Sequence, residues 1–326
     1  MLATVKKGVV LIKTKNVMIN NKDLFGNNIK KTLKEKYILP PYSVIDLNKT
    51  EYKNRAKRYI KMGIKSEIGR LSAVYTASSS KDTNKIYELE KGWSDGAKKY
   101  RERLVGKNKG VSVFNPFVCE VLYNWFCPEN GTILDPFAGG SVRGIMANYL
   151  GYKYTGIELR KEQVESNREQ GLDVLDVNNQ PQWYVGDSEK VTQELQAEYD
   201  FIFSCPPYAN LEVYSDLDDD ISNMEYPLFL EKYSKIIKNS CEKLKEGCFA
   251  VFVVSEVRKK GKGGYFGGYI GFVSDTINCF KDAGMDYYNE IIMINNTGNA
   301  GLRADKYMRT KKVVRVHQNI LVFKKS

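Results

Sequence analysis

From residue 111 onward, short apolar segments alternate with longer segments of helical character. This alternation is typical of repeated strand–helix units and predicts an α/β fold with a doubly wound, largely parallel sheet of seven strands. The expected strands are 132–134, 152–157, 183–185, 201–204, 248–255, 286–294 and 318–323. The expected helices are 116–126, a segment from the glycine turn to about 150, 161–170, 189–198, 227–244 and 269–283. No helix is expected between the last two strands, so they are predicted to pair antiparallel as an edge hairpin.

Length and composition narrow the class of protein. The chain has 326 residues, of which 42% are hydrophobic, enough for a substantial core. No apolar run approaches the roughly 18 residues of a membrane span, and the N-terminal apolar stretch is too short for a secretory leader. The six cysteines form no CxxC pair and there is one histidine, His317. We therefore expect no metal site, no membrane association and a location in a reducing cytoplasm.

Charge is distributed unevenly along the chain. Residues 1–110 contain 26 Lys and Arg against 10 Asp and Glu, a net charge of +16. The remaining residues contain 24 basic and 29 acidic side chains, a net charge of −5. Such asymmetry favours a polyanionic partner for the N-terminal third, although a generally lysine-rich composition would also scatter lysines there. The sequence predicts a basic N-terminal extension (1–110) that contacts nucleic acid and a catalytic domain (111–326).

Within the basic region, two segments have a recognisable character. Residues 40–46 are expected to be extended, because a residue that precedes proline is pushed out of the helical region. Residues 52–62 are basic, with the aromatic side chains of Tyr52 and Tyr59 interleaved. Whether this third of the chain folds alone, wraps the catalytic domain or orders on nucleic acid is left open by the sequence.

Polar and glycine residues follow four consecutive predicted strands. Gly139 and Gly140 follow the first strand and allow the backbone to approach a ligand at a helix start. Glu158 ends the second strand, 23 residues after Asp135, where a carboxylate typically holds ribose hydroxyls. Asp187 ends the third strand and can accept a hydrogen bond from an adenine amino group. Because ligands bind beyond the carboxyl ends of parallel strands, this order predicts a nucleoside cofactor site.

The fourth of these strands ends unusually. The apolar run 201–204 stops at Cys205, which is followed by Pro206, Pro207 and Tyr208. Two prolines make the loop rigid, and such a loop can present backbone carbonyls and one aromatic ring. Beside a nucleoside site, these groups suit a flat, amino-bearing base.

These residues resemble those of the S-adenosylmethionine-dependent DNA amino methyltransferases, which modify adenine N6 or cytosine N4. Asp135-Pro136-Phe137 with Gly139 is similar to the family's glycine motif, and Pro206-Pro207-Tyr208 to its catalytic motif. The resemblance implies S-adenosylmethionine as cofactor and a Rossmann-like methyltransferase sheet with the last strand antiparallel. It implies that the cofactor is bound by Asn115, Pro116, Phe117, Asp135, Pro136, Phe137, Gly139, Gly140, Ser141, Glu158 and Asp187. It implies a catalytic segment made of Ser204, Cys205, Pro206, Pro207 and Tyr208.

The family's chemistry assigns roles to this segment. An exocyclic amine is a poor nucleophile because its lone pair is delocalised into the ring, so acceptors must draw its hydrogens. The resemblance implies that the Pro206 carbonyl is one acceptor and that Tyr208 stacks on a base flipped out of the duplex. Such stacking contributes about 1–3 kcal/mol per base.

The sequence departs from the family pattern in two places. Gly140-Ser141 reverses the usual Ser-Gly order, and Cys205 occupies the position of a polar acceptor. A thiol is a weak acceptor. Three interpretations remain: Ser204 takes the acceptor role through a shifted loop; the Cys205 and Pro206 carbonyls suffice; or Cys205 is a nucleophile of the cytosine C5 type. The third has no activating histidine close in the sequence.

Two basic segments in the C-terminal part are candidates for contact with double-stranded DNA. They follow the fifth strand and precede the last, and their candidate residues are Arg258, Lys259, Lys260, Lys262, Arg303 and Arg309. Residues 40–70 and 315–319 also resemble bacteriophage-encoded DNA methylases. The leading hypothesis is a site-specific DNA methyltransferase, adenine N6 ahead of cytosine N4. An RNA base methyltransferase and an inactive, methyltransferase-like DNA-binding protein are the alternatives.

Overall fold

The computed structural model describes residues 32–64, 114–208, 219–260, 266–295 and 300–326. The chain divides into two compact units, Met1–Pro41 and Tyr42–Ser326. In the first unit, α1 (Leu33–Tyr37) begins with a capping box, in which Thr32 and Glu35 satisfy each other's backbone N–H groups. Everything that follows concerns the second unit.

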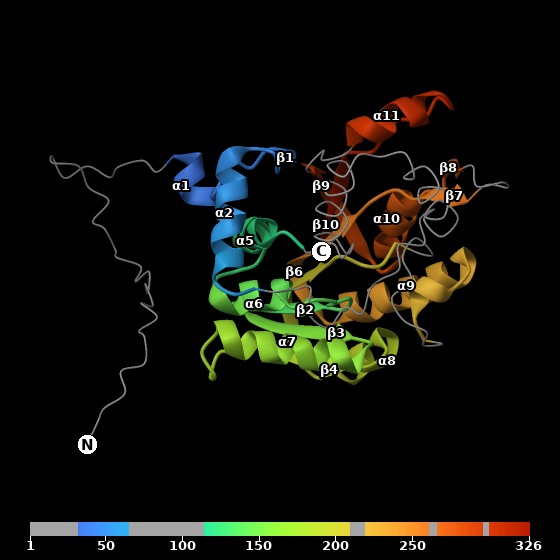
Figure 1. Ribbon diagram of the computed structural model, residues 1–326. Coiled ribbons are helices and arrows are strands. Elements are labelled where there is room, and N and C mark those ends of the chain that lie inside the picture. The colour runs from blue at the N-terminus through green and yellow to red at the C-terminus, as the bar shows by residue number, and fades with distance from the viewer. Residues whose placement is uncertain (1–31, 65–113, 209–218, 261–265, 296–299) are drawn as a thin grey trace, which may run out of the picture. The chain divides into compact units, whose positions relative to one another are not determined.

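The second unit is built on one eight-stranded sheet in the order β1-β9-β10-β6-β5-β2-β3-β4 (Figure 1). β6, β5, β2, β3 and β4 run parallel to one another, as β1 does to β9. β10 is antiparallel to both β9 and β6. The strands are β1 (Val44–Asp46), β2 (Thr132–Asp135), β3 (Lys153–Glu158), β4 (Gln182–Val185), β5 (Tyr199–Ser204), β6 (Leu244–Val254), β9 (Met285–Ile294) and β10 (His317–Lys325). The predicted doubly wound α/β class is confirmed.

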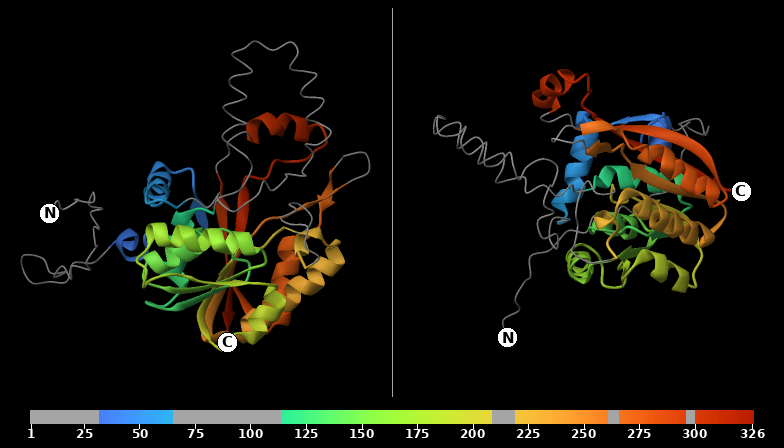
Figure 2. Two further views of the ribbon diagram at one scale, coloured as in Figure 1. Left: turned by 60° about the horizontal axis from the view of Figure 1, so that its bottom comes forward. Right: turned by 90° about the vertical axis from the view of Figure 1, so that its right-hand side faces the viewer.

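Helices cover both faces of this sheet (Figure 2). They are α2 (Thr50–Lys61), α5 (Pro116–Phe126), α6 (Val142–Tyr149), α7 (Lys161–Val174), α8 (Ser188–Glu194), α9 (Tyr226–Glu242), α10 (Phe272–Asp282) and α11 (Ala300–Met308). A short 3-10 helix spans Ile221–Asn223, and β7 (Arg258–Lys260) pairs antiparallel with β8 (Phe266–Tyr269) in a small second sheet. Within the described ranges, no helix has the length and apolar character needed to cross a membrane.

Alternation along the strands directs side chains to two cores. On β5, Phe201 and Phe203 lie on one face, where both rings meet the Tyr123 ring of α5 edge-on. Ile202, between them, belongs to the opposite core, which α9 and α10 complete. In that core the rings of Phe280 and Phe323 stack with centroids 3.9 Å apart. The inner strands β2, β3 and β5 are buried on both sides along most of their length.

The last two strands pair antiparallel as predicted, but two details of that prediction are wrong. α11 lies between β9 and β10 in the chain, and β10 lies inside the sheet rather than at its edge. Four consecutive residues of β10, Ile320 to Phe323, are completely buried. Such a continuous apolar run is characteristic of a strand covered on both faces, and it was the signal for an interior position.

The eighth strand comes from the basic N-terminal region. Residues 44–46 form β1, which pairs with β9 in the register Val44↔Ile292, and the expectation of an extended segment is confirmed. The basic, aromatic segment that follows is α2, whose Tyr52 ring stacks on Phe117 with centroids 4.7 Å apart. Arg55 Nε of α2 donates to Glu120 Oε2 of α5 at 2.6 Å. Residues 42–64 are therefore packed on the sheet and its helices.

Candidate active site

A cavity of about 1130 Å³ lies at the carboxyl edge of the parallel strands and brings the predicted strand-end residues together. Ten of the predicted cofactor-binding and catalytic residues line it: Asn115, Pro136, Phe137, Gly139, Glu158, Asp187, Cys205, Pro206, Pro207 and Tyr208. Six do not line it: Pro116, Phe117, Asp135, Gly140, Ser141 and Ser204. The first set faces the cavity, and the second lies behind its wall.

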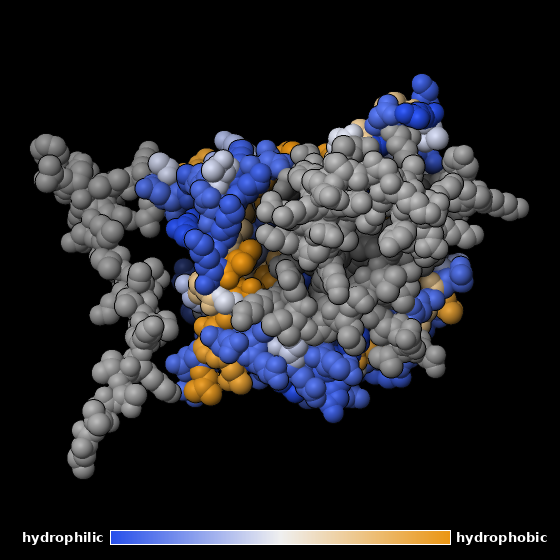
Figure 3. All heavy atoms as spheres, in the orientation of Figure 1, coloured by the Kyte–Doolittle hydropathy of each residue, from blue (hydrophilic) through white to orange (hydrophobic). Residues whose placement is uncertain are grey.

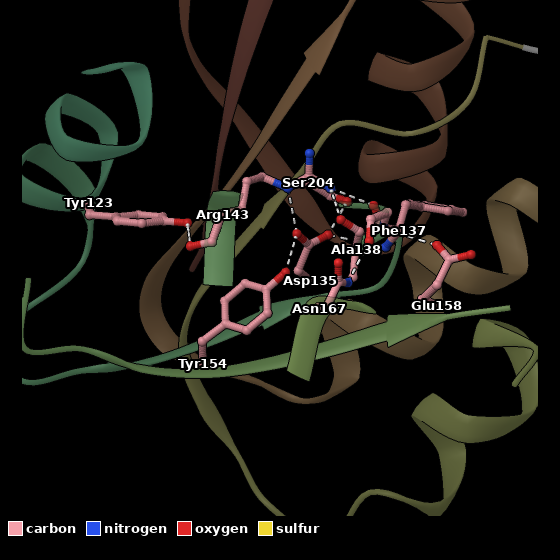
Figure 4. Close-up of polar contacts among 10 residues, drawn as sticks. Tyr123, Asp135, Phe137, Ala138, Arg143, Tyr154, Glu158, Asn167 and Ser204 are labelled. Atoms are coloured by element: carbon pink, nitrogen blue, oxygen red, sulfur yellow. Dashed lines mark hydrogen bonds and ion pairs between the residues drawn. The ribbon is translucent and has the colours of Figure 1, made fainter. Parts of the chain in front are cut away.

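Asp135 belongs to the wall, because its carboxylate is fully buried and saturated with hydrogen bonds (Figure 4). Oδ1 accepts from Ser204 Oγ at 2.6 Å and from the Phe137 backbone N–H at 3.2 Å. Oδ2 accepts from Arg143 Nε at 2.6 Å and from the Tyr154 hydroxyl at 2.7 Å. Four donors around one carboxylate leave it no capacity for a ligand, so Asp135 fixes the ends of β2 and β5 relative to each other.

Arg143, which the sequence analysis missed, completes this cluster. Its Nη2 donates to the backbone oxygens of Phe137 at 2.5 Å and Ala138 at 2.9 Å, so the guanidinium braces the glycine turn. Burial by itself lowers the pKa of Arg143, but the adjacent Asp135 carboxylate raises it, and the net shift of the pKa is upward. The sequence signal was a cation eight residues after a motif carboxylate, in the first turns of a largely buried helix.

The glycine turn orients Glu158 at the cavity wall. Gly139 has a φ of 53°, in the left-handed region that favours glycine. Its N–H donates to Glu158 Oε2 at 3.1 Å, while Glu158 Oε1 accepts from the Arg160 N–H at 3.0 Å. Asn167 Nδ2 of α7 holds the Gly139 carbonyl at 2.7 Å. The carboxylate is thus held by two backbone N–H groups, its Oε1 also lies 3.6 Å from Arg160 Nε, and the side chain lines the cavity.

Ser141 and the Asn115 segment have mainly structural contacts. Ser141 is buried, and its hydroxyl donates to Gln170 Oε1 of α7 at 2.9 Å. Asn115 caps α5 by accepting from the Phe117 N–H at 3.0 Å, and it also lines the cavity. Pro116 and Phe117 are buried within α5. Of this segment, only Asn115 is placed to meet a cofactor.

Asp187 lines the cavity, and its carboxylate is already engaged by neighbouring residues. Its Oδ1 accepts from the Glu189 N–H at 3.0 Å and so caps α8. Its Oδ2 lies 2.9 Å from Lys232 Nζ of α9, a residue that the sequence analysis did not single out. Burial lowers the pKa of Lys232, but hydrogen bonding to Asp187 and the charges of Asp187 and Asp219 raise that pKa overall. Any contact of Asp187 with an adenine amino group would therefore share a carboxylate that is already engaged.

The catalytic segment is held at both ends by side chains. Ser204 is fully buried and donates to Asp135, which does not favour the interpretation that Ser204 contacts a base. Tyr208 lies at the cavity with its ring edge-on to Phe272, at 6.0 Å between centroids. Its hydroxyl accepts from Gln318 Nε2 at 2.6 Å and lies 3.6 Å from Cys205 Sγ. The thiol is half-buried and is turned toward the tyrosine hydroxyl.

Basic side chains from several elements line the cavity. Arg258 and Arg315 both lie near the Tyr269 ring, with Cζ 4.2 and 5.9 Å from its centroid. Arg303 of α11 also lines the cavity, as do Lys53 and Lys57 of α2. We refer to these five cations as the basic rim. Figure 3 shows the hydrophilic surface of α2 beside apolar residues at the position of α5.

The other predicted nucleic-acid contacts lie away from the cavity or outside the described residues. Lys259 is exposed on β7, and the exposed Arg309 pairs with Asp305 at 2.8 Å. The Lys260 side chain and the whole of Lys262 are outside the described part of the chain. No group of three or more potential metal-binding side chains occurs among the described residues.

The residues present fit a nucleoside cofactor. Typical ligand cavities measure about 300–1,000 Å³, so the volume here can hold a cofactor and a base together. Glu158 offers carboxylate oxygens for a diol, and it is flanked by the apolar Ile157 and Leu159, which also line the cavity. Gly139 lets the backbone approach closely on the other side. Glu158, Gly139, Asn115 and the Phe137 ring are the groups that would hold S-adenosylmethionine.

The sequence matches the model of one protein family. A family model of N6/N4 methylases, described as DNA methylase, matches residues 7–169, half of the chain. The match crosses the predicted boundary at residue 110 and includes the glycine turn and Glu158. A search of curated proteins gave no match.

Solved structures with a similar fold are remote in sequence. TrmN from Thermus thermophilus has 13% identity and a TM-score of 0.45, covering 69% of this chain and 53% of that one. This chain therefore spans about half the length of TrmN. A TehB-like SAM-dependent methyltransferase from Corynebacterium glutamicum has 16% identity and a TM-score of 0.40, with coverages of 71% and 98%. Magnesium protoporphyrin IX methyltransferase from Synechocystis has 14% identity and a TM-score of 0.39, with coverages of 76% and 99%.

Proposed function

Because this chain belongs to the N6/N4 DNA methylase family, we propose that it methylates an exocyclic amine of a base in DNA, adenine N6 ahead of cytosine N4. It is a methyltransferase that uses S-adenosylmethionine. The observation that carries the finer proposal is that one cavity joins the glycine turn and Glu158 to Pro206, Pro207 and Tyr208. A cofactor held at the first group would face a base held at the second.

We assign the cofactor side of the cavity to Gly139, Glu158 and Asn115. Glu158 would accept hydrogen bonds from the ribose hydroxyls, because its carboxylate is fixed by the Gly139 and Arg160 N–H groups and faces the cavity. When bound, S-adenosylmethionine supplies an electrophilic methyl group on a sulfonium. Asp135 and Arg143 contribute by holding the wall rigid.

We assign the base side to residues 205–208. The target base would stack on the Tyr208 ring after flipping out of the duplex, since a base inside the stack cannot reach a recessed cavity. The Cys205 and Pro206 carbonyls would accept the hydrogens of the amine and concentrate its lone pair on nitrogen. The amine nitrogen would then take the methyl group that the cofactor supplies as the methyl–sulfur bond breaks, and the proton held by a backbone carbonyl would pass to solvent water. This assignment needs no side-chain acceptor at position 205, which fits the engaged Ser204 and the thiol that faces Tyr208.

The basic rim would contact the phosphates around the flipped nucleotide. Its cations come from α2, α11, β7 and the segment before β10, so they line the cavity from several elements rather than from one face of the sheet. Cations placed this way favour a polyanion that extends beyond the cavity. Within this proposal, the N-terminal region contributes through Lys53 and Lys57, and a wider role of residues 1–110 in binding nucleic acid stays a prediction.

The proposal is tested by incubating the purified chain with methyl-labelled S-adenosylmethionine and duplex DNA, single-stranded DNA or tRNA. We expect label in DNA, released on digestion as N6-methyladenine. Label only in RNA would identify an RNA methyltransferase. Cofactor binding without transfer to any nucleic acid would identify an inactive DNA-binding relative. Sequencing modified bases in DNA from cells that express the chain would then give the target site.

A further inference from the structure

The described residues contain one hydrogen-bond chain that enters the active site from the sheet edge opposite the cofactor half. It begins at Asn48, just after β1, whose Nδ2 donates to the Asn295 carbonyl at 3.0 Å. Asn295 Nδ2, just after β9, donates to Gln318 Oε1 at 3.3 Å. Gln318 Nε2, at the start of β10, donates to the Tyr208 hydroxyl at 2.6 Å. Three strand ends are thereby linked to the predicted base platform.

The direction of these bonds defines what each group does. Gln318 uses its carbonyl oxygen for Asn295 and its amino group for Tyr208, so its amide orientation is set from both sides. Gln318, Asn295 and Tyr208 all line the cavity and are half-buried. At 2.6 Å, the bond to Tyr208 is the shortest of the three hydrogen bonds that link Asn48 to Tyr208. It holds a side chain that otherwise turns about two torsions.

Cys205 fits the same arrangement. Its Sγ lies 3.6 Å from the Tyr208 hydroxyl, which also accepts a hydrogen bond from Gln318 Nε2. Both neighbours therefore constrain the position of the phenol group. Phe272 meets the Tyr208 ring edge-on at 6.0 Å and limits its rotation further. A ring fixed before the base arrives avoids an ordering cost of about 0.5–1.5 kcal/mol per immobilised side chain.

We infer that Gln318 is a positioning residue for Tyr208, supported by Asn295 and by the N-terminal strand β1 through Asn48. This inference rests on the proposed function, in which Tyr208 is the base platform. It also gives β1 a role in the site, because β1 pairs with β9 and fixes the segment that carries Asn295. The thiol at position 205 becomes a neighbour of the tyrosine hydroxyl rather than a partner of the base.

The contact is tested first without any methylation assay. 3-Fluorotyrosine placed at position 208 reports its surroundings through its ¹⁹F resonance in the full-length protein. We expect Gln318→Leu to shift this resonance and Gln196→Leu to leave it unchanged, because Gln196 is exposed and does not line the cavity. An unchanged resonance in folded Gln318→Leu protein would overturn the inference even if the enzyme methylates DNA.

Activity tests the consequence. Tyr208→Phe and Gln318→Leu should each lower kcat/KM on DNA about 5-fold, the equivalent of about 1 kcal/mol for one neutral hydrogen bond. The double variant should lose no more than either single variant, because both changes remove the same contact. Additive losses would mean that the hydroxyl contacts nucleic acid directly, and the inference would be wrong.

A second variant guards against misfolding. Gln318→Glu keeps the length of the side chain and can accept the hydroxyl hydrogen instead, so it should retain more activity than Gln318→Leu. If Gln318→Leu does not fold, Tyr208→Phe still tests the tether alone, and full activity of that variant would overturn the inference. Absence of methyl transfer by the unaltered protein would refute the proposed function but not the ¹⁹F result.

Discussion

The two halves of the cavity are held in different ways. On the cofactor side, Asp135 accepts four hydrogen bonds and Arg143 donates three within a buried network. On the base side, the half-buried Tyr208 is contacted by the Gln318 amide, the Cys205 thiol and the Phe272 ring. The comparison indicates that the cofactor wall is part of the core, whereas the base platform is a supported surface loop. Mutations should therefore affect stability on one side and activity on the other.

The largest effect is expected from Asp135→Asn. Removing one partner of a buried ion pair leaves Arg143 charged and uncompensated, which costs about 3–5 kcal/mol of unfolding free energy. Urea denaturation measures this change. Asp305→Asn removes the carboxylate of the exposed pair with Arg309 and should leave the unfolding midpoint unchanged. Equal, small effects of the two variants would contradict the assignment of Asp135 to the core.

Tyr208→Ala should show the opposite behaviour. Loss of base stacking is expected to lower kcat/KM on DNA about 5- to 150-fold, from about 1–3 kcal/mol of stacking. The urea midpoint and the affinity for S-adenosylmethionine should stay close to those of the unaltered protein. Tyr184→Ala, at an exposed tyrosine of β4 that does not line the cavity, is the matched control. A large loss of stability in Tyr208→Ala would mean that the two halves do not differ as described.

Glu158→Gln separates ligand contact from wall support. Glutamine retains an acceptor for the Gly139 N–H but removes the charge, so the Kd for S-adenosylmethionine should rise about 10- to 150-fold, from the roughly 1.5–3 kcal/mol of charged hydrogen bonds. Calorimetric titration measures it. Glu165→Gln, on the exposed side of α7, should leave that Kd unchanged. If the Kd is unaffected in both variants, Glu158 does not face the cofactor.

The basic rim predicts a smaller, salt-dependent effect. Replacing Lys53 and Lys57 together by alanine should reduce the slope of log K against log salt by about 1.8, since each phosphate contact contributes about 0.9. Binding of duplex DNA at several salt concentrations gives the slope. The control variant replaces the exposed Lys161 and Lys281, which do not line the cavity. The same slope in both double variants would place the DNA elsewhere.

Cys205→Ala should have the smallest effect. If carbonyl oxygens are the acceptors of the base, the variant loses only a weak contact with the Tyr208 hydroxyl and should retain activity within about 5-fold, the size of one weak hydrogen bond. A nucleophilic thiolate would instead make this variant inactive. Measurement of N6- or N4-methyl product against 5-methylcytosine identifies which chemistry operates.

Much of the site could be predicted from local sequence. Glycine at position 139, the carboxylate of Glu158 and the Pro-Pro-Tyr segment are recognisable because each satisfies a local requirement of strand end, turn or ring. Asp135 and Ser204 were also singled out, and the structure bonds them to each other behind the cavity wall. Sequence spacing shows that each ends a strand and does not show that the two strands are neighbours.

The doubly wound sheet, the glycine turn and the Pro206-Pro207 loop can be predicted from the sequence, since they follow from periodicity and backbone restrictions within a few residues. The partners of Asp135, the link from Gln318 to Tyr208 and the addition of β1 to the sheet depend on contacts between distant parts of the chain. Tyr208 and Gln318 lie 110 residues apart. A hydrogen bond over that separation depends on which strands become neighbours, and strand order is a property of the assembled sheet.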